Sequence, residues 1–121
     1  MTTTEQTTSS NPDEYNGWTN RETWATALHL SNDEMLYRTC VAIVARADEE
    51  VAVFYDSNDF EMPPIADTNL AAERIEQFVT DHVEEFLHNG VEIEWARMMI
   101  VDVGSFWRVD WRAVADAARL P

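Results

Sequence analysis

Residues 68–90 read TNLAAERIEQFVTDHVEEFLHNG, and this stretch decides the fold class. Apolar residues recur in it at steps of three and four, which is the period of one face of an α-helix. That face comprises Ala71, Ile75, Phe78, Val79, His82, Val83, Phe86 and Leu87, and the opposite face comprises Glu73, Glu76, Gln77, Thr80, Asp81 and Glu84. The pattern predicts an amphipathic helix from Thr68 to His88, with Asn89-Gly90 as its C-terminal stop.

Two further helices are predicted on the N-terminal side of this stretch. Thr19 and Ser31 each precede a glutamate by three residues, which is the spacing of a capping box. We therefore expect one helix over residues 20–30 and another over residues 32–55, in which the acidic run 48–50 is a candidate bend or break. The expected inward-facing residues are Trp24, Ala27 and Leu28 in the first helix and Leu36, Cys40, Ile43, Val44, Ala47, Val51, Phe54 and Tyr55 in the second.

The C-terminal third is also predicted to be helical. Pro63-Pro64 excludes a helix from the connection over residues 56–67. Residues 91–103 indicate a short helix that ends at Gly104, with a strand over residues 98–103 as the alternative. Asp110 is a suitable N-cap for a last helix over residues 111–120. In this helix Trp111, Val114, Ala115 and Ala118 would face in, Arg112, Asp116 and Arg119 would face out, and Arg112 would pair with Asp116.

These elements define an all-α fold class. We expect a single compact domain of four to five helices over residues 15–121, preceded by a disordered N-terminal tail over residues 1–14. The tail lacks the basic start and apolar stretch of a secretory signal, and no apolar run is long enough to span a membrane. A single cysteine suits a reducing compartment. We therefore expect a cytoplasmic protein without membrane contact.

The chain is strongly acidic. It has 23 acidic residues and 8 arginines, with no lysine, which gives a net charge of −15. Residues 1–96 carry −16 and residues 97–121 carry +1, so the acidity belongs to the first four-fifths of the chain. Such a surface repels nucleic acids, so direct nucleic-acid binding is not expected. Three explanations stay open: halophilic adaptation to a salt-rich cytoplasm, mimicry of a nucleic acid, and chance acidity in a genome that favours arginine codons.

No catalytic, cofactor or metal site is predicted. Glu85 and His88 have the Glu-x-x-His spacing of di-iron bundles, but no second copy of the motif exists. Residues 56–67 begin like a calcium loop, yet Glu61 stands where that loop requires glycine. Cys40 falls within an apolar stripe and is expected to be a packed thiol, and His82 is expected at the edge of the core. We therefore expect a protein that is not an enzyme.

The C-terminal segment interleaves arginines with aromatic residues. Arg and Trp dominate binding hot spots, and the same residue types stack on nucleic-acid bases. The segment contains Trp95, Arg97, Phe106, Trp107, Arg108, Trp111 and Arg112. The simpler interpretation is that the tryptophans belong to the core and the arginines pair with the protein's own acids. Trp107 is the tryptophan expected to be exposed, because it lies between two predicted helices, and Trp107, Arg108 and Arg112 are candidate partner-binding residues.

Residues 15–24, YNGWTNRETW, followed by Leu28, Leu30, Asn32 and Asp33, resemble the signature of a family of small uncharacterised proteins. That family occurs in bacteriophages, archaeal viruses, plasmids and their hosts. Its usual form has an aromatic or similar residue where this chain has Arg21. Residues 109–111 and 114–115 also resemble the family's C-terminal pattern, with Ala113 in place of the usual acidic residue. The resemblance implies an accessory protein of a mobile element and implies no activity.

The signature allows a structural and a functional interpretation. In the structural one, Asn16-Gly17 turns the chain, the first helix is capped, and Trp18 and Trp24 fold back onto the domain. In the functional one, Asn16, Trp18, Asn20 and Arg21 form a partner-binding corner.

The sequence therefore favours a non-enzymatic binding protein, an accessory factor of a virus or mobile element that acts through protein–protein contacts. Its specific form is an acidic nucleic-acid mimic directed at a host protein. The first alternative is a module that binds nucleic acid or a regulatory complex through Arg97, Trp107, Arg108 and Arg112. The second is a small enzyme or metal protein.

Overall fold

The computed structural model describes residues 14–58 and 68–119, and within them the chain forms α-helices and one 3-10 turn but no strand. The elements are α1 (Arg21–Asn32), α2 (Glu34–Ser57), α3 (Asn69–Asn89), α4 (Glu94–Val103), the 3-10 turn η2 (Phe106–Arg108) and α5 (Trp111–Ala117). The fold class is the all-α class that the sequence predicts. The predicted tail and most of the connection over residues 56–67, including Pro63-Pro64 and most of the calcium-like loop, lie outside the described residues.

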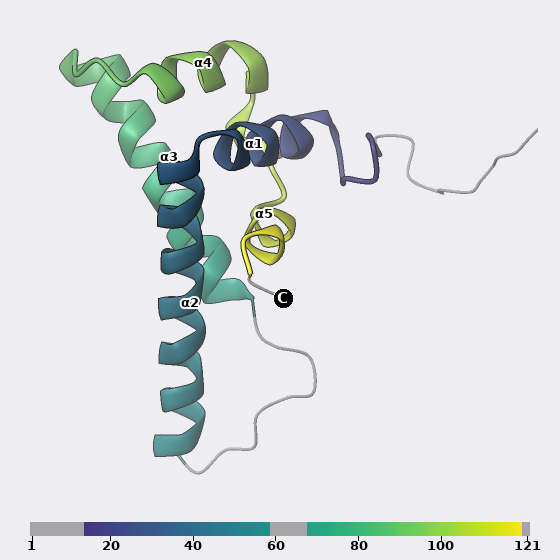
Figure 1. Ribbon diagram of the computed structural model, residues 1–121, viewed down its shortest axis with the longest axis vertical. Coiled ribbons are helices and arrows are strands. Elements are labelled where there is room, and N and C mark those ends of the chain that lie inside the picture. Colours follow the sequence, from purple (N-terminus) through teal and green to yellow (C-terminus); the bar gives the residue numbers. More distant parts are fainter. Residues whose placement is uncertain (1–13, 59–67, 120–121) are drawn as a thin grey trace, which may run out of the picture.

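The two long helices form an antiparallel pair on which the others pack. In Figure 1, α2 and α3 run alongside each other, α4 lies across the end of α3, and α1 crosses beside α2. The short α5 packs against both α3 and α1. As a result, the start of α1 lies beside the chain that links α4 to α5.

The core lies between all five α-helices, with α1 contributing Ala25 and Leu30. Ile75 and Val79 of α3 are completely buried, and Val44 of α2 and Met99 of α4 pack in the same cluster. Seven alanines are buried with them, and such small side chains allow helices to approach closely. These alanines are Ala25, Ala47, Ala71, Ala72, Ala96, Ala115 and Ala118. All four residues expected to face inward from α5 are buried, as predicted.

The predicted apolar stripes are wrong at their outer ends. Phe54, near the end of α2, is 54% exposed, and Leu87, near the end of α3, is 55% exposed. Figure 1 shows the end of α2 running past the start of α3, which removes one neighbour from its last turns. The helical period therefore continues beyond the part of each helix that is packed.

In α1 the predicted inward face is only partly right, because Trp24 packs against the core whereas Leu28 does not. The buried residues are Thr23, Ala25, Thr26 and Leu30, whereas Leu28 is 39% exposed. Trp24 and Ala27 are only half-buried. The apolar period misleads because two threonines, small enough to pack closely, occupy the side that faces the other helices.

Both predicted capping boxes are also wrong. The N-cap of α1 is Asn20, whose side chain accepts from the Thr23 amide, and the N-cap of α2 is Asp33, which accepts from the Leu36 amide. Both are preferred N-cap residues, and each stands one or two residues after the hydroxyl that the motif indicates. Asp110 caps α5 and left-handed Gly90 ends α3, as predicted.

Three smaller expectations are settled by the helix bounds. Residues 98–103 are helical, so the strand alternative is wrong. The acidic run 48–50 does not interrupt α2, because Asp48 pairs with Arg119 and Glu50 pairs with Arg74, which offsets like-charge repulsion within the run. α5 ends at Ala117 rather than near residue 120.

Candidate partner-binding site

The signature begins with a tight turn. Asn16 and Gly17 both have positive φ, 50° and 85°, which is the pattern of a type I′ turn. The amides and carbonyls of Tyr15 and Trp18 bond to each other across it, at 2.9 and 2.8 Å. The turn lays the Tyr15 ring on Trp24 with centroids 5.0 Å apart, so the signature folds back onto α1 as the structural interpretation predicts.

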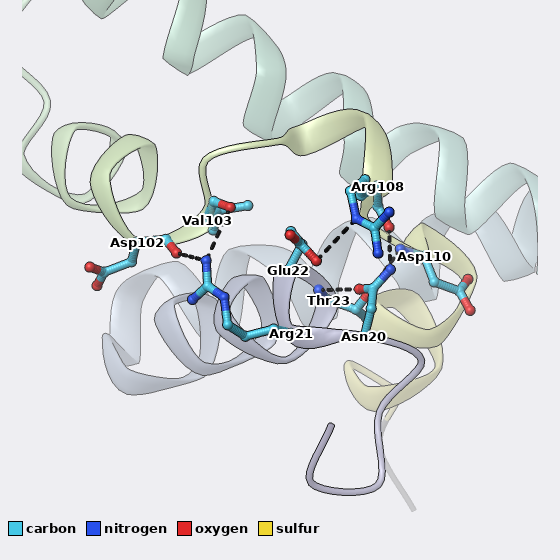
Figure 2. Close-up of polar contacts among 8 residues, drawn as sticks. All are labelled: Asn20, Arg21, Glu22, Thr23, Asp102, Val103, Arg108 and Asp110. Carbon is cyan, nitrogen blue, oxygen red and sulfur yellow. Dashed lines mark hydrogen bonds and ion pairs between the residues drawn. The ribbon is translucent and has the colours of Figure 1, made fainter. Parts of the chain in front are cut away.

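Asn20 joins α1 to the chain that follows α4. It is 8% exposed, and its Oδ1 accepts from both the amide and the hydroxyl of Thr23, at 2.8 and 2.6 Å. Its Nδ2 donates to the Arg108 carbonyl at 2.8 Å, across 88 residues of sequence. Figure 2 shows the Asn20 side chain between these two partners. One amide group therefore caps a helix and fixes η2 on it.

Asp110 makes the second connection. Its amide donates to the Thr23 hydroxyl at 2.8 Å, and its Oδ2 accepts from the Thr19 hydroxyl at 2.7 Å. Its other oxygen, Oδ1, accepts from the Ala113 amide as the cap of α5. The two sequence pieces that carry the family resemblance thus meet in space, and we call the contacts between residues 19–23 and 102–110 the junction.

Arg21 closes the third side of the junction. Its guanidinium donates to the carbonyl of Asp102 at 2.6 Å and to that of Val103 at 3.4 Å, at the end of α4. The last carbonyls of a helix carry partial negative charge, and a cation there is favourable. His29 also contacts the Asp102 carboxylate, at 2.7 Å. The Arg21 side chain therefore caps a neighbouring helix.

Glu22 and Arg108 form an ion pair at 3.3 Å on the outside of the junction. A hydrogen bond from its own backbone amide lowers the pKa of the Glu22 carboxyl, and the Arg108 guanidinium lowers it further. The Arg108 guanidinium also lies 5.9 Å from the centre of the Trp107 ring, within cation–π range.

Trp107 is 81% exposed, as its position between helices predicts. It is the middle residue of η2, and the junction holds residues on its C-terminal side through Asn20, Thr23 and Glu22. The other four tryptophans, Trp18, Trp24, Trp95 and Trp111, are half-buried or buried. The structure thus presents one large aromatic side chain to solvent from an anchored segment.

The remaining arginines of the segment lie apart from this position. Arg97 pairs with Glu92 at 3.2 Å, and Arg112 donates to the Thr68 hydroxyl at 3.1 Å. The predicted Arg112–Asp116 pair is wrong, since Asp116 instead pairs with Arg119. Of the predicted site residues, the structure joins Asn20 and Arg108 directly and places Arg21 beside them, whereas Arg112 of α5 contacts Thr68 at the start of α3.

Sequence reasoning missed the roles of Glu22, Thr23 and Asp102 at the junction. The sequence pattern assigns Glu22 only to a capping box and gives Asp102 no role beyond the charge of residues 97–121. The two threonines of α1 stand three residues apart, which is a signal that one side of the helix makes specific contacts.

Cys40 and His82 both pack within the fold. Burial raises the pKa of the Cys40 thiol to about 11, consistent with the packed thiol that was predicted. His82 bonds to the Phe78 carbonyl and packs against both the Phe78 and the Trp95 rings at the edge of the core, as predicted. Within residues 14–58 and 68–119, no three potential ligands gather to hold a metal ion. No helix in this part of the chain is long and apolar enough to cross a membrane.

The fold and the junction define a class: a small helical protein in which an anchored turn presents an exposed tryptophan. A family model described as a family of unknown function, DUF7249, matches residues 11–103, and the chain belongs to that family. The match includes the signature at the start of α1 but ends before Trp107. No curated protein and no solved structure matches the chain.

Proposed function

We propose that this protein is a non-enzymatic binding protein that acts through protein–protein contacts, with Trp107 as the anchoring side chain. The observation that carries the proposal is the 81% exposure of Trp107. A tryptophan can bury 150–250 Å² of surface, and tryptophan is the residue most typical of binding hot spots. A partner that covers this ring would gain the hydrophobic free energy that folding leaves unused.

The junction makes Trp107 suitable for binding. Hydrogen bonds from Asn20 and to Thr23 fix the backbone at Arg108 and Asp110, just after the tryptophan. A backbone that is already ordered loses little conformational entropy when a partner binds. The Arg108 guanidinium beside the ring adds a second hot-spot residue type to the same surface.

Charge supports a basic protein as the partner. The net charge of −15 attracts a positively charged surface and repels nucleic acid. The arginines that a nucleic-acid-binding module would use contact Glu92, Glu22 and Thr68 instead. Proteins that bind nucleic acids present basic surfaces, so the finer proposal is that the chain mimics a nucleic acid toward such a host protein. The resemblance to mobile-element proteins supports an accessory role of this kind.

A pull-down from host-cell lysate at fixed ionic strength tests the proposal. The immobilised wild type is compared with two matched variants. Trp107→Ser removes the anchor, and Val101→Ser removes an apolar side chain that is 77% exposed on α4. We expect a basic, nucleic-acid-binding protein to be retained by the wild type and by Val101→Ser, and at least tenfold less by Trp107→Ser. Equal retention by all three would refute Trp107 as the anchor. A gel shift of DNA or RNA at low salt would favour the nucleic-acid-binding alternative instead.

A further inference from the structure

A pocket of about 150 Å³ lies between α1, the start of α2 and α5, away from Trp107. The stripe of α1 that was predicted to face the core forms one wall, through Trp24, Ala27 and Leu28. Trp18 of the signature, Tyr37 and the Cys40 thiol form much of the rest. We propose that this pocket binds a small neutral compound with a single aromatic ring.

The size of the pocket selects a ligand of one ring. An engineered protein cavity of about 150 Å³ with apolar walls binds benzene, which sets the scale. A mostly apolar concavity of this kind is the usual form of a small-molecule site. The pocket is open on one side, so a ring can enter without a change in the fold.

The walls select a neutral ligand. None of the residues that line the pocket carries a charge, in a chain whose net charge is −15. A charged ligand would lose hydration there without gaining an ion pair, so its binding is disfavoured. An anion would in addition be repelled by the surrounding carboxylates.

The rings of the walls favour an aromatic ligand and are already in place. Trp24 packs against Tyr15 at 5.0 Å between ring centroids, and the backbone of Trp18 is fixed by its two hydrogen bonds across the Asn16-Gly17 turn. Aromatic pairs gain from offset or edge-to-face contacts beyond their buried area. The residues that fold the signature back onto α1 therefore also build the pocket.

Three probes that share one ring test the charge selectivity. Toluene, benzoate and benzylammonium are titrated into ¹⁵N-labelled full-length protein, and the indole N–H resonances are followed by NMR. We expect toluene to shift the Trp18 and Trp24 resonances along a saturable curve, with the Trp107 resonance unchanged. We expect the two charged probes to bind at least tenfold more weakly. A linear shift of all tryptophans with toluene, or equal binding of the charged probes, would overturn the proposal.

A filled pocket provides the matched control. Ala27→Leu places a larger side chain in the pocket, whereas Ala42→Leu adds the same side chain at an exposed position of α2. We expect at least a tenfold loss of toluene binding in the first variant and none in the second. If Ala27→Leu does not fold, Ala117→Leu fills the pocket from α5. Deletion of residues 120–121 is a further test. A tenfold gain in toluene binding would overturn the proposal, because the chain's own C-terminus would then be the occupant.

Discussion

Replacing Asn20 with alanine should destabilise the protein more than its position near a helix end suggests. The substitution removes the cap of α1 and the bond to the Arg108 carbonyl together. It also leaves the Thr23 hydroxyl, which is completely buried, without the oxygen to which it donates. The junction would then lose its link between α1 and η2.

The size of the effect can be built from these parts. Loss of an N-cap costs about 1 kcal/mol. A buried donor or acceptor left without a partner costs roughly 1–3 kcal/mol, with the smaller value for a group that water can reach, as at half-exposed Arg108. The three parts together give an expected loss of about 3–5 kcal/mol in the free energy of unfolding. For a chain of this length that corresponds to a fall in Tm of roughly 15 °C.

Urea unfolding followed by circular dichroism measures this loss. Asn20→Asp keeps an acceptor for Thr23 but no longer donates to the Arg108 carbonyl, so its cost should be intermediate. Asn58→Ala is the matched control, because Asn58 caps the exposed end of α2 with its own side-chain hydrogen bond to Phe54. It should cost at most about 0.5 kcal/mol. If Asn20→Ala costs no more than Asn58→Ala, the junction does not hold η2 in place.

Three further predictions follow from single side chains and from charge. The buried Thr26 hydroxyl has no hydrogen-bond partner, so Thr26→Val should raise the free energy of unfolding by about 1 kcal/mol, with exposed Thr39→Val as the unaffected control. The pKa of the Glu22 carboxyl is lowered by folding, so Glu22 stabilises the protein above the usual glutamate pKa. This contribution is lost as the pH falls through the pKa of the folded state. The difference in the free energy of unfolding between wild type and Glu22→Gln should therefore shrink below about pH 4. Tm should rise with salt concentration, because screening weakens the repulsion among an excess of acidic residues, and a Tm independent of salt would contradict halophilic adaptation.

The helices could be predicted because their signals are local. The stripe of α3 is buried at Ile75, Val79 and Val83 as its period requires, and Gly90 and Asp110 act at the ends where their chemistry places them. The junction could not be predicted, because its bonds join residues about 80 to 90 positions apart, as Asn20 and Arg108 show. The buried side of α1 was mispredicted for a related reason: Thr23 is buried by partners that only the tertiary fold supplies.

Residues that are fully engaged in folding can be separated from residues that are left for a partner or a ligand. Asn20, Thr23 and Asp110 use their polar groups in hydrogen bonds within the protein. Folding alone therefore accounts for these three residues, and no partner is needed to explain them. Folding does not account for Trp107, which gains no burial from its position, nor for an uncharged pocket in a strongly acidic chain. Trp18 and Trp24 lie at the boundary, because the turn that fixes them also shapes the pocket. Trp18 and Trp24, rather than Asn20 and Arg21, are therefore the side chains of the signature that remain available for a ligand.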